Sequence, residues 1–269
     1  MRRMMNKKIQ KFWWMLNGGA DVARTHAATT LGPTESERTP EEWLANMDDP
    51  FRAALLSMYN GLPQKGSDGA VHKINDTARI SPEQGTWMYE VTLALKPTSI
   101  LEVGMAYGFS SLYFLAALKR NGSGTLTSID PFQHNPYNGV GVTHALTHAP
   151  KDASGTSFNL VEDRSDRAIV DLLRSGRRYD LIYIDGNHRF DDVLVDFYLC
   201  DQVCGLGGHI ILDDMWMSSI KSVAEFIRMN RDNFVEVKSP VWNTAMFKKV
   251  KKDDRSWNHF KTFSVSPSA

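Results

Sequence analysis

The sequence has few cysteines, no excess of charge of either sign and no long apolar run. Its 269 residues include only two cysteines, Cys200 and Cys204, placed four apart in a pattern that predicts a helix. Two thiols make neither a disulfide framework nor a complete zinc site. The 31 basic side chains balance the 31 acidic ones, so no global field attracts nucleic acid or an anionic membrane. We therefore expect a protein of the reducing cytoplasm without a nucleic-acid partner.

The N-terminal segment is basic and then briefly apolar. Its apolar run, Phe12–Leu16, is too short for a signal peptide or a membrane span. A weak interfacial helix is one alternative. We prefer a partly disordered arm over residues 1–38, either a frayed tail or a segment that packs over the active site or against a second subunit. This arm is the only hint of a homo-oligomer.

Two helix-start signals precede the main body of the chain. Thr39-Pro40-Glu41-Glu42 and Ser81-Pro82-Glu83-Gln84 each combine a hydroxyl cap, a proline and a Glu or Gln three residues after the cap. They predict one helix through Trp43 and Leu44 and another up to about Leu95. Residues 39–79 are thus expected to form a helical lead-in, with a turn-rich connection at Gly61–Gly69.

After Pro97, apolar runs alternate with helical patterns. Continuous apolar strands separated by amphipathic helices are typical of a parallel sheet covered on both faces. The last two runs are joined by a turn too short for a crossover helix, which predicts an antiparallel hairpin at the sheet edge. The predicted fold is α/β, with a doubly wound, mostly parallel seven-stranded sheet in a domain over residues 80–250 and a tail over 251–269. Strands are predicted at 99–103, 125–129, 158–161, 179–184, 208–212, 234–238 and 244–250, and helices at 110–119, 165–175, 191–204 and 219–230.

A glycine-containing turn follows the first of these strands. The strand carries Glu102, then Gly104 and Gly108 follow, and small hydroxyl residues open the next helix. Glycines let the backbone approach a ligand closely, and a helix start offers N–H groups to an anion. A dinucleotide fold would place Gly-x-Gly-x-x-Gly here. Glu-x-Gly-x-x-x-Gly instead resembles the first motif of class I S-adenosylmethionine (SAM) dependent methyltransferases.

This resemblance implies SAM as the cofactor, bound by Gly104, Gly108 and polar side chains near them. Asp130 ends the second strand and is expected to accept hydrogen bonds from both ribose hydroxyls. We expect Ser110 to bind the methionine carboxylate through its hydroxyl and nearby N–H groups, and Glu102 to accept from the ammonium or the ribose. Ser165, after the third strand, is expected at the adenine edge. Helix capping is the alternative role for Asp130 and the two serines.

Acidic residues follow the next two strands. Asp185 comes after the fourth strand, and Asp213 and Asp214 come after the fifth. Neighbouring strand ends bring these carboxylates together, where they repel unless a cation lies among them. Oxygen ligands suit Mg²⁺ better than zinc, so all three are predicted metal ligands, and Asp185 also a cofactor contact. The alternative is that they form helix caps and a tight turn.

His188 lies three residues beyond Asp185 and is the predicted general base for a hydroxyl proton, kept unprotonated by the cation. Its alternative role is to open the following helix. Asp185, His188 and the pair Asp213-Asp214 together resemble the metal-dependent small-molecule O-methyltransferases, a group that includes catechol O-methyltransferase and the macrocin-type enzymes. The catechol enzymes carry lysine in place of His188. Members of this group usually have Asp-Asn or Glu-Asp at the positions of Asp213-Asp214, so this pair departs from their pattern.

The resemblance implies methyl transfer from SAM to a hydroxyl of a small molecule with neighbouring oxygens, aided by Mg²⁺. Alternatives are metal-independent transfer to nitrogen or oxygen, and a SAM-fold protein that binds without methylating. An NAD-dependent oxidoreductase is least favoured, because the glycine spacing and the terminal hairpin disagree with it. The insertion Pro131–Ser157 is predicted to be a polar cap over the substrate side, and its histidines do not form a recognisable metal site.

Overall fold

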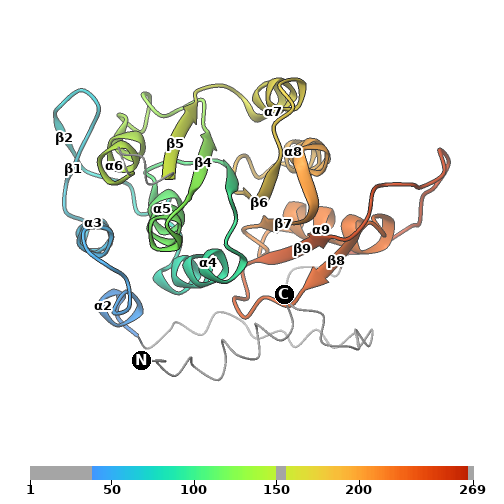
Figure 1. Ribbon diagram of the computed structural model, residues 1–269, viewed down its shortest axis with the longest axis horizontal. Helices are drawn as coiled ribbons and strands as arrows, with labels where there is room; N and C mark the ends of the chain where they lie inside the picture. The colour runs from blue at the N-terminus through green and yellow to red at the C-terminus, as the bar shows by residue number, and fades with distance from the viewer. Residues whose placement is uncertain (1–37, 150–155, 266–269) are drawn as a thin grey trace. The chain divides into compact units, whose positions relative to one another are not determined.

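The computed structural model describes residues 38–149 and 156–265 (Figure 1). The predicted N-terminal arm therefore lies outside the described residues except for its last position. The described chain contains a seven-stranded sheet of order β5-β4-β3-β6-β7-β9-β8 and a separate two-stranded hairpin.

The large sheet is parallel except at one edge. Its first five strands pair in parallel, and β9 pairs antiparallel with both β7 and β8. This arrangement confirms the predicted fold class and the terminal hairpin. Cys204, predicted to share a helix with Cys200, instead begins β7, and both thiols are free and buried. The strands are β3 (Ser99–Val103), β4 (Gly124–Ile129), β5 (Thr156–Val161), β6 (Tyr179–Ile184), β7 (Cys204–Leu212), β8 (Phe234–Val237) and β9 (Ala245–Lys249).

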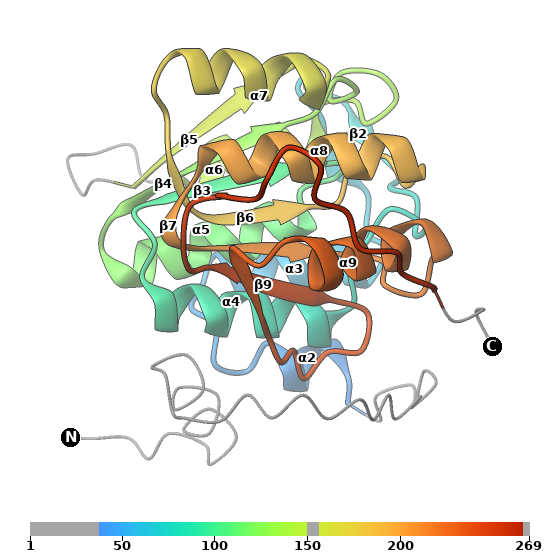
Figure 2. The ribbon, with the colours of Figure 1, turned by 90° about the vertical axis from the view of Figure 1, so that its right-hand side faces the viewer.

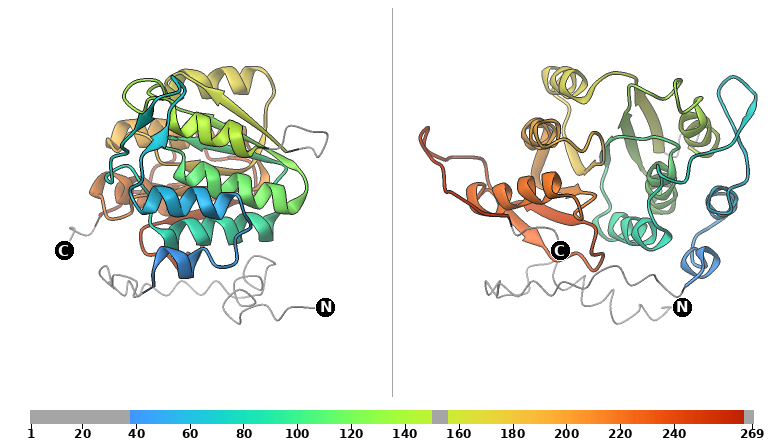
Figure 3. Two further views of the ribbon diagram at one scale, coloured as in Figure 1. Left: turned by 90° about the vertical axis from the view of Figure 1, so that its left-hand side faces the viewer. Right: turned by 180° about the vertical axis from the view of Figure 1, so that it is seen from behind.

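Helices cover both faces of the sheet. One face carries α4 (Pro82–Leu95), α5 (Phe109–Asn121) and α6 (Val140–His148), seen from that side in the left view of Figure 3. The other face carries α7 (Ser165–Arg174), α8 (Phe190–Val203) and α9 (Ser218–Asn230), seen in front in Figure 2. Within the described part of the chain, no helix is long and apolar enough to cross a membrane.

The core between the sheet and helices α8 and α9 is apolar and closely packed. Ile182 and Ile210 of the sheet meet Phe197 of α8 and Val223 and Ile227 of α9, and all five are at most 1% exposed. Burying a side chain of this size stabilises a fold by roughly 1.5–3 kcal/mol. This core fixes the strands whose carboxyl ends carry the polar residues described below.

The lead-in is helical, as predicted, but in two pieces. Thr39 and Glu42 form the expected capping box at α2 (Pro40–Trp43), and a second helix, α3 (Phe51–Tyr59), follows and packs on α5. The connection predicted to be turn-rich also holds a short strand, β1 (Gln64–Lys65), which pairs with β2 (Val71–His72).

The insertion predicted to be only a polar cap contains a helix. In α6, Val140, Val142 and Ala145 are buried, while Thr143 and His144 are partly exposed. The sequence prediction missed this helix because it is short and rich in β-branched residues, which have low helix propensity. The insertion therefore contributes to the core as well as to the surface.

A pair of glycine substitutions tests how tightly the turn after β3 is packed. Gly104 has φ +88°, and a Cβ there would overlap the backbone carbonyl oxygen of Asp185. Gly122 has φ +83°, but no atom lies within 4 Å of the corresponding Cβ position. We expect Gly122→Ala to cost about 1–2 kcal/mol of left-handed strain, and Gly104→Ala to cost about 1–3 kcal/mol more because of overpacking. Urea unfolding measures both losses, and equal losses would contradict the close packing.

Candidate functional site

The turn from β3 to α5 is held close to its neighbours. Gly104 lies against the backbone of Asp185, and a Cβ on Gly108 would touch Gly141 at the start of α6. Gly108 also caps α5 with φ +83° and without a side-chain hydrogen bond. Helix starts of this kind present backbone N–H groups to anions. The turn therefore has the features of a ligand-binding turn bordered by β6 and α6.

Glu102 lies beneath this turn and not on its surface. It is fully buried and accepts hydrogen bonds from Ser110 at 2.6 Å, Ser111 at 2.6 Å and Ser128 at 2.5 Å. Burial raises the pKa of Glu102 to about 7, although the serine hydroxyls oppose the rise. The carboxyl group of Glu102 thus ties β3, β4 and α5 together, and its contact with an ammonium or a ribose stays a prediction. The Ser110 hydroxyl is directed to Glu102, which leaves its backbone N–H for a ligand.

Asp130 holds the glycine turn from the end of β4. Its Oδ2 accepts from the backbone N–H groups of Met105 at 3.0 Å and Ala106 at 2.7 Å, and from Gln133 Nε2 at 3.1 Å. Its Oδ1 accepts from the N–H of Phe132 at 2.7 Å. These four protein donors hold a carboxylate that is 4% exposed, so Asp130 fixes the turn. Its bonds to the ribose hydroxyls stay a prediction.

Ser165 begins α7 at the carboxyl end of β5. It is half-buried, and its hydroxyl is hydrogen-bonded to the buried carboxyl of Asp196. Burial raises the pKa of Asp196 to about 6, and the bond from Ser165 opposes this rise. The prediction that Ser165 lies at an adenine edge is not tested by this geometry.

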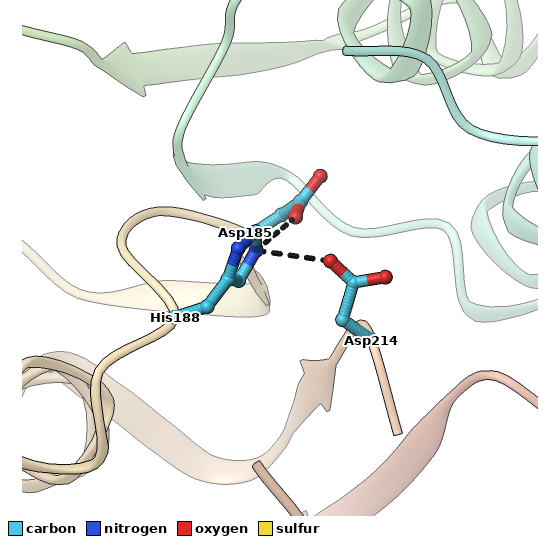
Figure 4. Close-up of side chains that lie close together, drawn as sticks. All are labelled: Asp185, His188 and Asp214. Carbon is cyan, nitrogen blue, oxygen red and sulfur yellow. Dashed lines mark hydrogen bonds and ion pairs between the residues drawn. The ribbon is translucent and has the colours of Figure 1, made fainter. Parts of the chain in front are cut away.

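An acid-histidine cluster lies at the ends of β6 and β7. Asp185 follows β6 and Asp214 follows β7, and the two strands are parallel neighbours. His188 Nε2 lies 3.0 Å from Asp214 Oδ2 and 3.5 Å from Asp185 Oδ1 (Figure 4). One ligand atom from each residue lies within 4.8 Å of the others, so the group is compact enough to hold a metal ion. Of the three acids predicted to converge, Asp185 and Asp214 lie together with His188 beside them. Their roles as ligands and base stay predictions.

Electrostatics within the cluster favour a charged histidine. Hydrogen bonds to Asp185 and Asp214 raise the pKa of His188 to about 10. Burial raises the pKa of Asp185. Burial also acts to raise the pKa of Asp214, but hydrogen bonds from His188 and its other donors outweigh this effect and lower it. Without a cation, His188 is therefore an imidazolium, unlike the unprotonated base predicted for the loaded site.

Asp213, the third predicted ligand, does not join this cluster. Its Oδ2 accepts from Gln84 Nε2 at 2.6 Å and from the hydroxyl of Tyr183, and its Oδ1 accepts from the N–H of Asp214 at 2.7 Å. Burial raises the pKa of Asp213 well above its usual range. Asp213 is therefore not part of the compact group formed by Asp185, His188 and Asp214, and its role as a direct ligand stays a prediction.

Three residues that contact the acids escaped the sequence prediction. Gln84 was interpreted as part of a capping signal, and its N–H does bond Ser81 Oγ at 3.1 Å, but its amide extends to Asp213. Tyr183 lies in an apolar strand and donates to Asp185 at 3.2 Å as well as to Asp213. Asn243, just before β9, donates to Asp213 and Asp214. The phenol of Tyr183, a polar group in the mostly apolar strand β6, is the only sequence signal that pointed to one of these residues.

Comparison with known proteins agrees with the fold. Residues 101–215 match a family model described as a methyltransferase domain, whereas no curated protein matches the sequence. A methyltransferase from Podospora anserina, PaMTH1, solved with S-adenosylhomocysteine (SAH), is similar with TM-score 0.61 and 15% identity over 84% of this chain and 100% of that one. The O-methyltransferase TomG from Streptomyces achromogenes, in complex with SAM, is similar with TM-score 0.52 and 16% identity over 79% of this chain and 94% of that one. A putative caffeoyl-CoA O-methyltransferase from Staphylococcus aureus is similar with TM-score 0.56 and 12% identity over 77% of this chain and 96% of that one.

Titration of His188 tests the charge state of the cluster. In the absence of divalent cations we expect its NMR signals to titrate near pH 10, and Asp214→Asn to lower that pKa by one unit or more. Because the pKa of His188 in the folded protein is raised above 6.5, its ion pairs stabilise the fold fully below pH 6.5. This contribution to the free energy of unfolding is lost as the pH rises through about 10. Asp166→Asn, in the exposed pair with Arg164, serves as the control. An ordinary His188 pKa in the wild type would contradict the geometry.

Proposed function

Because residues 101–215 form a methyltransferase domain within a class I fold, we propose that the protein transfers the SAM methyl group to a hydroxyl of a small molecule with the help of a divalent cation. The close approach of Gly104 to the Asp185 backbone carries this proposal. It places the glycine turn directly beside the loop that bears the acid-histidine cluster. A cofactor on the turn and a cation at the cluster would therefore be neighbours.

The glycine turn fits the methionine end of SAM. Gly104 and Gly108 give the turn its left-handed backbone, and the backbone N–H groups near Ser110 at the start of α5 suit the methionine carboxylate. Asp185, half-buried on the other side of Gly104, is an acceptor for the ammonium group. We assign Ser165 to the adenine edge because it follows β5, the strand beyond β4. The two buried acids, Glu102 and Asp130, hold the turn in place.

The cluster fits a hard divalent cation such as Mg²⁺. Asp185 and Asp214 offer carboxylate oxygens, which Mg²⁺ prefers as ligands. A buried oxygen beside them, Asn243 Oδ1, also has no hydrogen-bond partner among the described residues. Buried acceptors normally have a partner, so this oxygen is available to an additional species. We assign the cation to Asp185 and Asp214, and the adjacent imidazole of His188 to proton transfer.

The reaction then divides among the residues of the cluster. A bound cation supplies positive charge that lowers the pKa of the acceptor hydroxyl and neutralises Asp185 and Asp214. Once these carboxylates no longer raise its pKa, His188 returns to its ordinary range and accepts the hydroxyl proton at Nε2. Asp213 remains behind the cluster, bonded to Gln84. The half-exposed indole of Trp216, whose N–H donates to Asp214 at 2.8 Å, borders the space for the acceptor.

One observation favours a second candidate, methyl transfer without a metal. The ion pair between His188 and Asp214 already balances charge at the cluster, so the site is not left as three uncompensated acids. In that reaction His188 would stay paired, and the acceptor would be a nitrogen or an unchelated oxygen. Methyl transfer that survives a chelator would favour this candidate.

Binding measurements test the proposed ligands. We expect the wild type to bind SAH in calorimetry and one Mn²⁺ in electron paramagnetic resonance titration. Asp185→Asn and Asp214→Asn should each weaken Mn²⁺ binding by about tenfold or more, because each removes a charged ligand. Asp192→Asn, in the first turn of α8, is the matched control and should bind as the wild type does. Wild-type protein that binds SAH but no Mn²⁺ would support the second candidate.

The role of His188 as a base predicts a specific kinetic defect. We expect His188→Ala to lower methyl transfer to acceptors with neighbouring hydroxyls by roughly 10²-fold or more, the range for a general base, with SAH affinity unchanged. His72→Ala, on the β1–β2 hairpin, is the control. Radiolabelled methyl transfer from SAM measures the rates, and an unchanged rate in His188→Ala would remove His188 from the mechanism.

A further inference from the structure

We propose that Asn243, in the connection between β8 and β9, is a positioning residue of the cation site. It holds Asp214 so that only one of its carboxylate oxygens faces the cluster. This inference rests on the proposed function, because it concerns the same cation. Asn243 lies outside the segment 101–215 that matches the family model, so that match assigns it no role.

The contacts of Asp214 divide between its two oxygens. Oδ1 accepts hydrogen bonds from Trp216 Nε1 at 2.8 Å and Asn243 Nδ2 at 3.3 Å. Neither of these donors bonds Oδ2, which lies 3.0 Å from His188 Nε2. The two donors thus fix Oδ1 and leave Oδ2 as the oxygen that faces Asp185 and His188.

Asn243 also links the two acids to each other. Its Nδ2 lies 3.2 Å from Asp213 Oδ1 in addition to its contact with Asp214. Adjacent carboxylates repel, and a donor shared between them reduces that repulsion. Asp214 further adopts the left-handed conformation, with φ +53°, which a non-glycine residue needs surrounding contacts to keep. The backbone of Asn243 provides one, because its carbonyl accepts from the N–H of Met215 at 3.0 Å.

The oxygen of the Asn243 amide also supports its role as a positioning residue. Asn243 Oδ1 is buried without a partner among the described residues, while Nδ2 is fully used on the two carboxylates. An unpaired buried acceptor is unfavourable and requires an explanation such as a bound water or ion. The two acids orient the amide, and Oδ1 is left free to accept a hydrogen bond.

The test is Mn²⁺ affinity measured by electron paramagnetic resonance, with SAH affinity measured in parallel. Removing a residue that orients a metal ligand typically weakens metal binding by about 10–100-fold, and we expect this loss in Asn243→Ala with SAH affinity unchanged. Asn243→Ser, which keeps a small polar side chain too short to reach both acids, provides the test if the alanine variant does not fold. Asn230→Ala removes a different amide, which bonds Lys261, and should leave Mn²⁺ affinity unchanged.

The outcomes separate this inference from the proposed function. Wild-type protein that binds no Mn²⁺ would remove the cation from the proposed function, and Asn243 would lose its role with it. If the wild type binds Mn²⁺ and the folded Asn243 variant binds it equally well, only the inference is overturned. A parallel loss of SAH and Mn²⁺ affinity in the variant would also overturn it, because that result indicates general disruption.

Discussion

The site depends on how the negative charge of three neighbouring carboxylates is balanced at the ends of β6 and β7. Parallel pairing of these strands places Asp185 beside the pair Asp213-Asp214. The structure separates the three acids into two groups. His188 contacts Asp185 and Asp214, whereas Tyr183 and other neutral donors bind Asp213. Buried carboxylates are tolerated only with such partners, so the division determines which acids remain available for a cation.

The glycine turn and the acid-histidine cluster are in direct contact through the backbone. Gly104 lies against the carbonyl of Asp185, while Asp130 and Glu102 fix the turn from below and from the side. A shift of Asp185 would therefore move the turn as well. This contact gives a physical route by which cation binding and cofactor binding influence each other in the proposed reaction.

Much of the fold follows from sequence patterning, because alternating apolar runs and amphipathic segments fix a parallel sheet with few alternatives. The observed sheet confirms the predicted class I methyltransferase fold, and residues 101–215 match a methyltransferase-domain model. Sequence order also predicts that Asp185, His188 and Asp214 meet. It could not predict that Asp213 bonds Gln84 and Tyr183, because these partners come from α4 and β6, distant from Asp213 in the sequence. The burial of Glu102 likewise depends on three serines from different elements.

The central claim is that a divalent cation binds between Asp185 and Asp214 beside the cofactor turn. Crystals grown with SAH and Mn²⁺, measured at the manganese absorption edge, test it most directly. The account predicts one anomalous peak at about 2.0–2.3 Å from an oxygen of each of these two carboxylates, with Asp213 still bonded to Gln84. A peak bound to Asp213 in place of Asp214, or no peak in crystals that contain SAH, would contradict it.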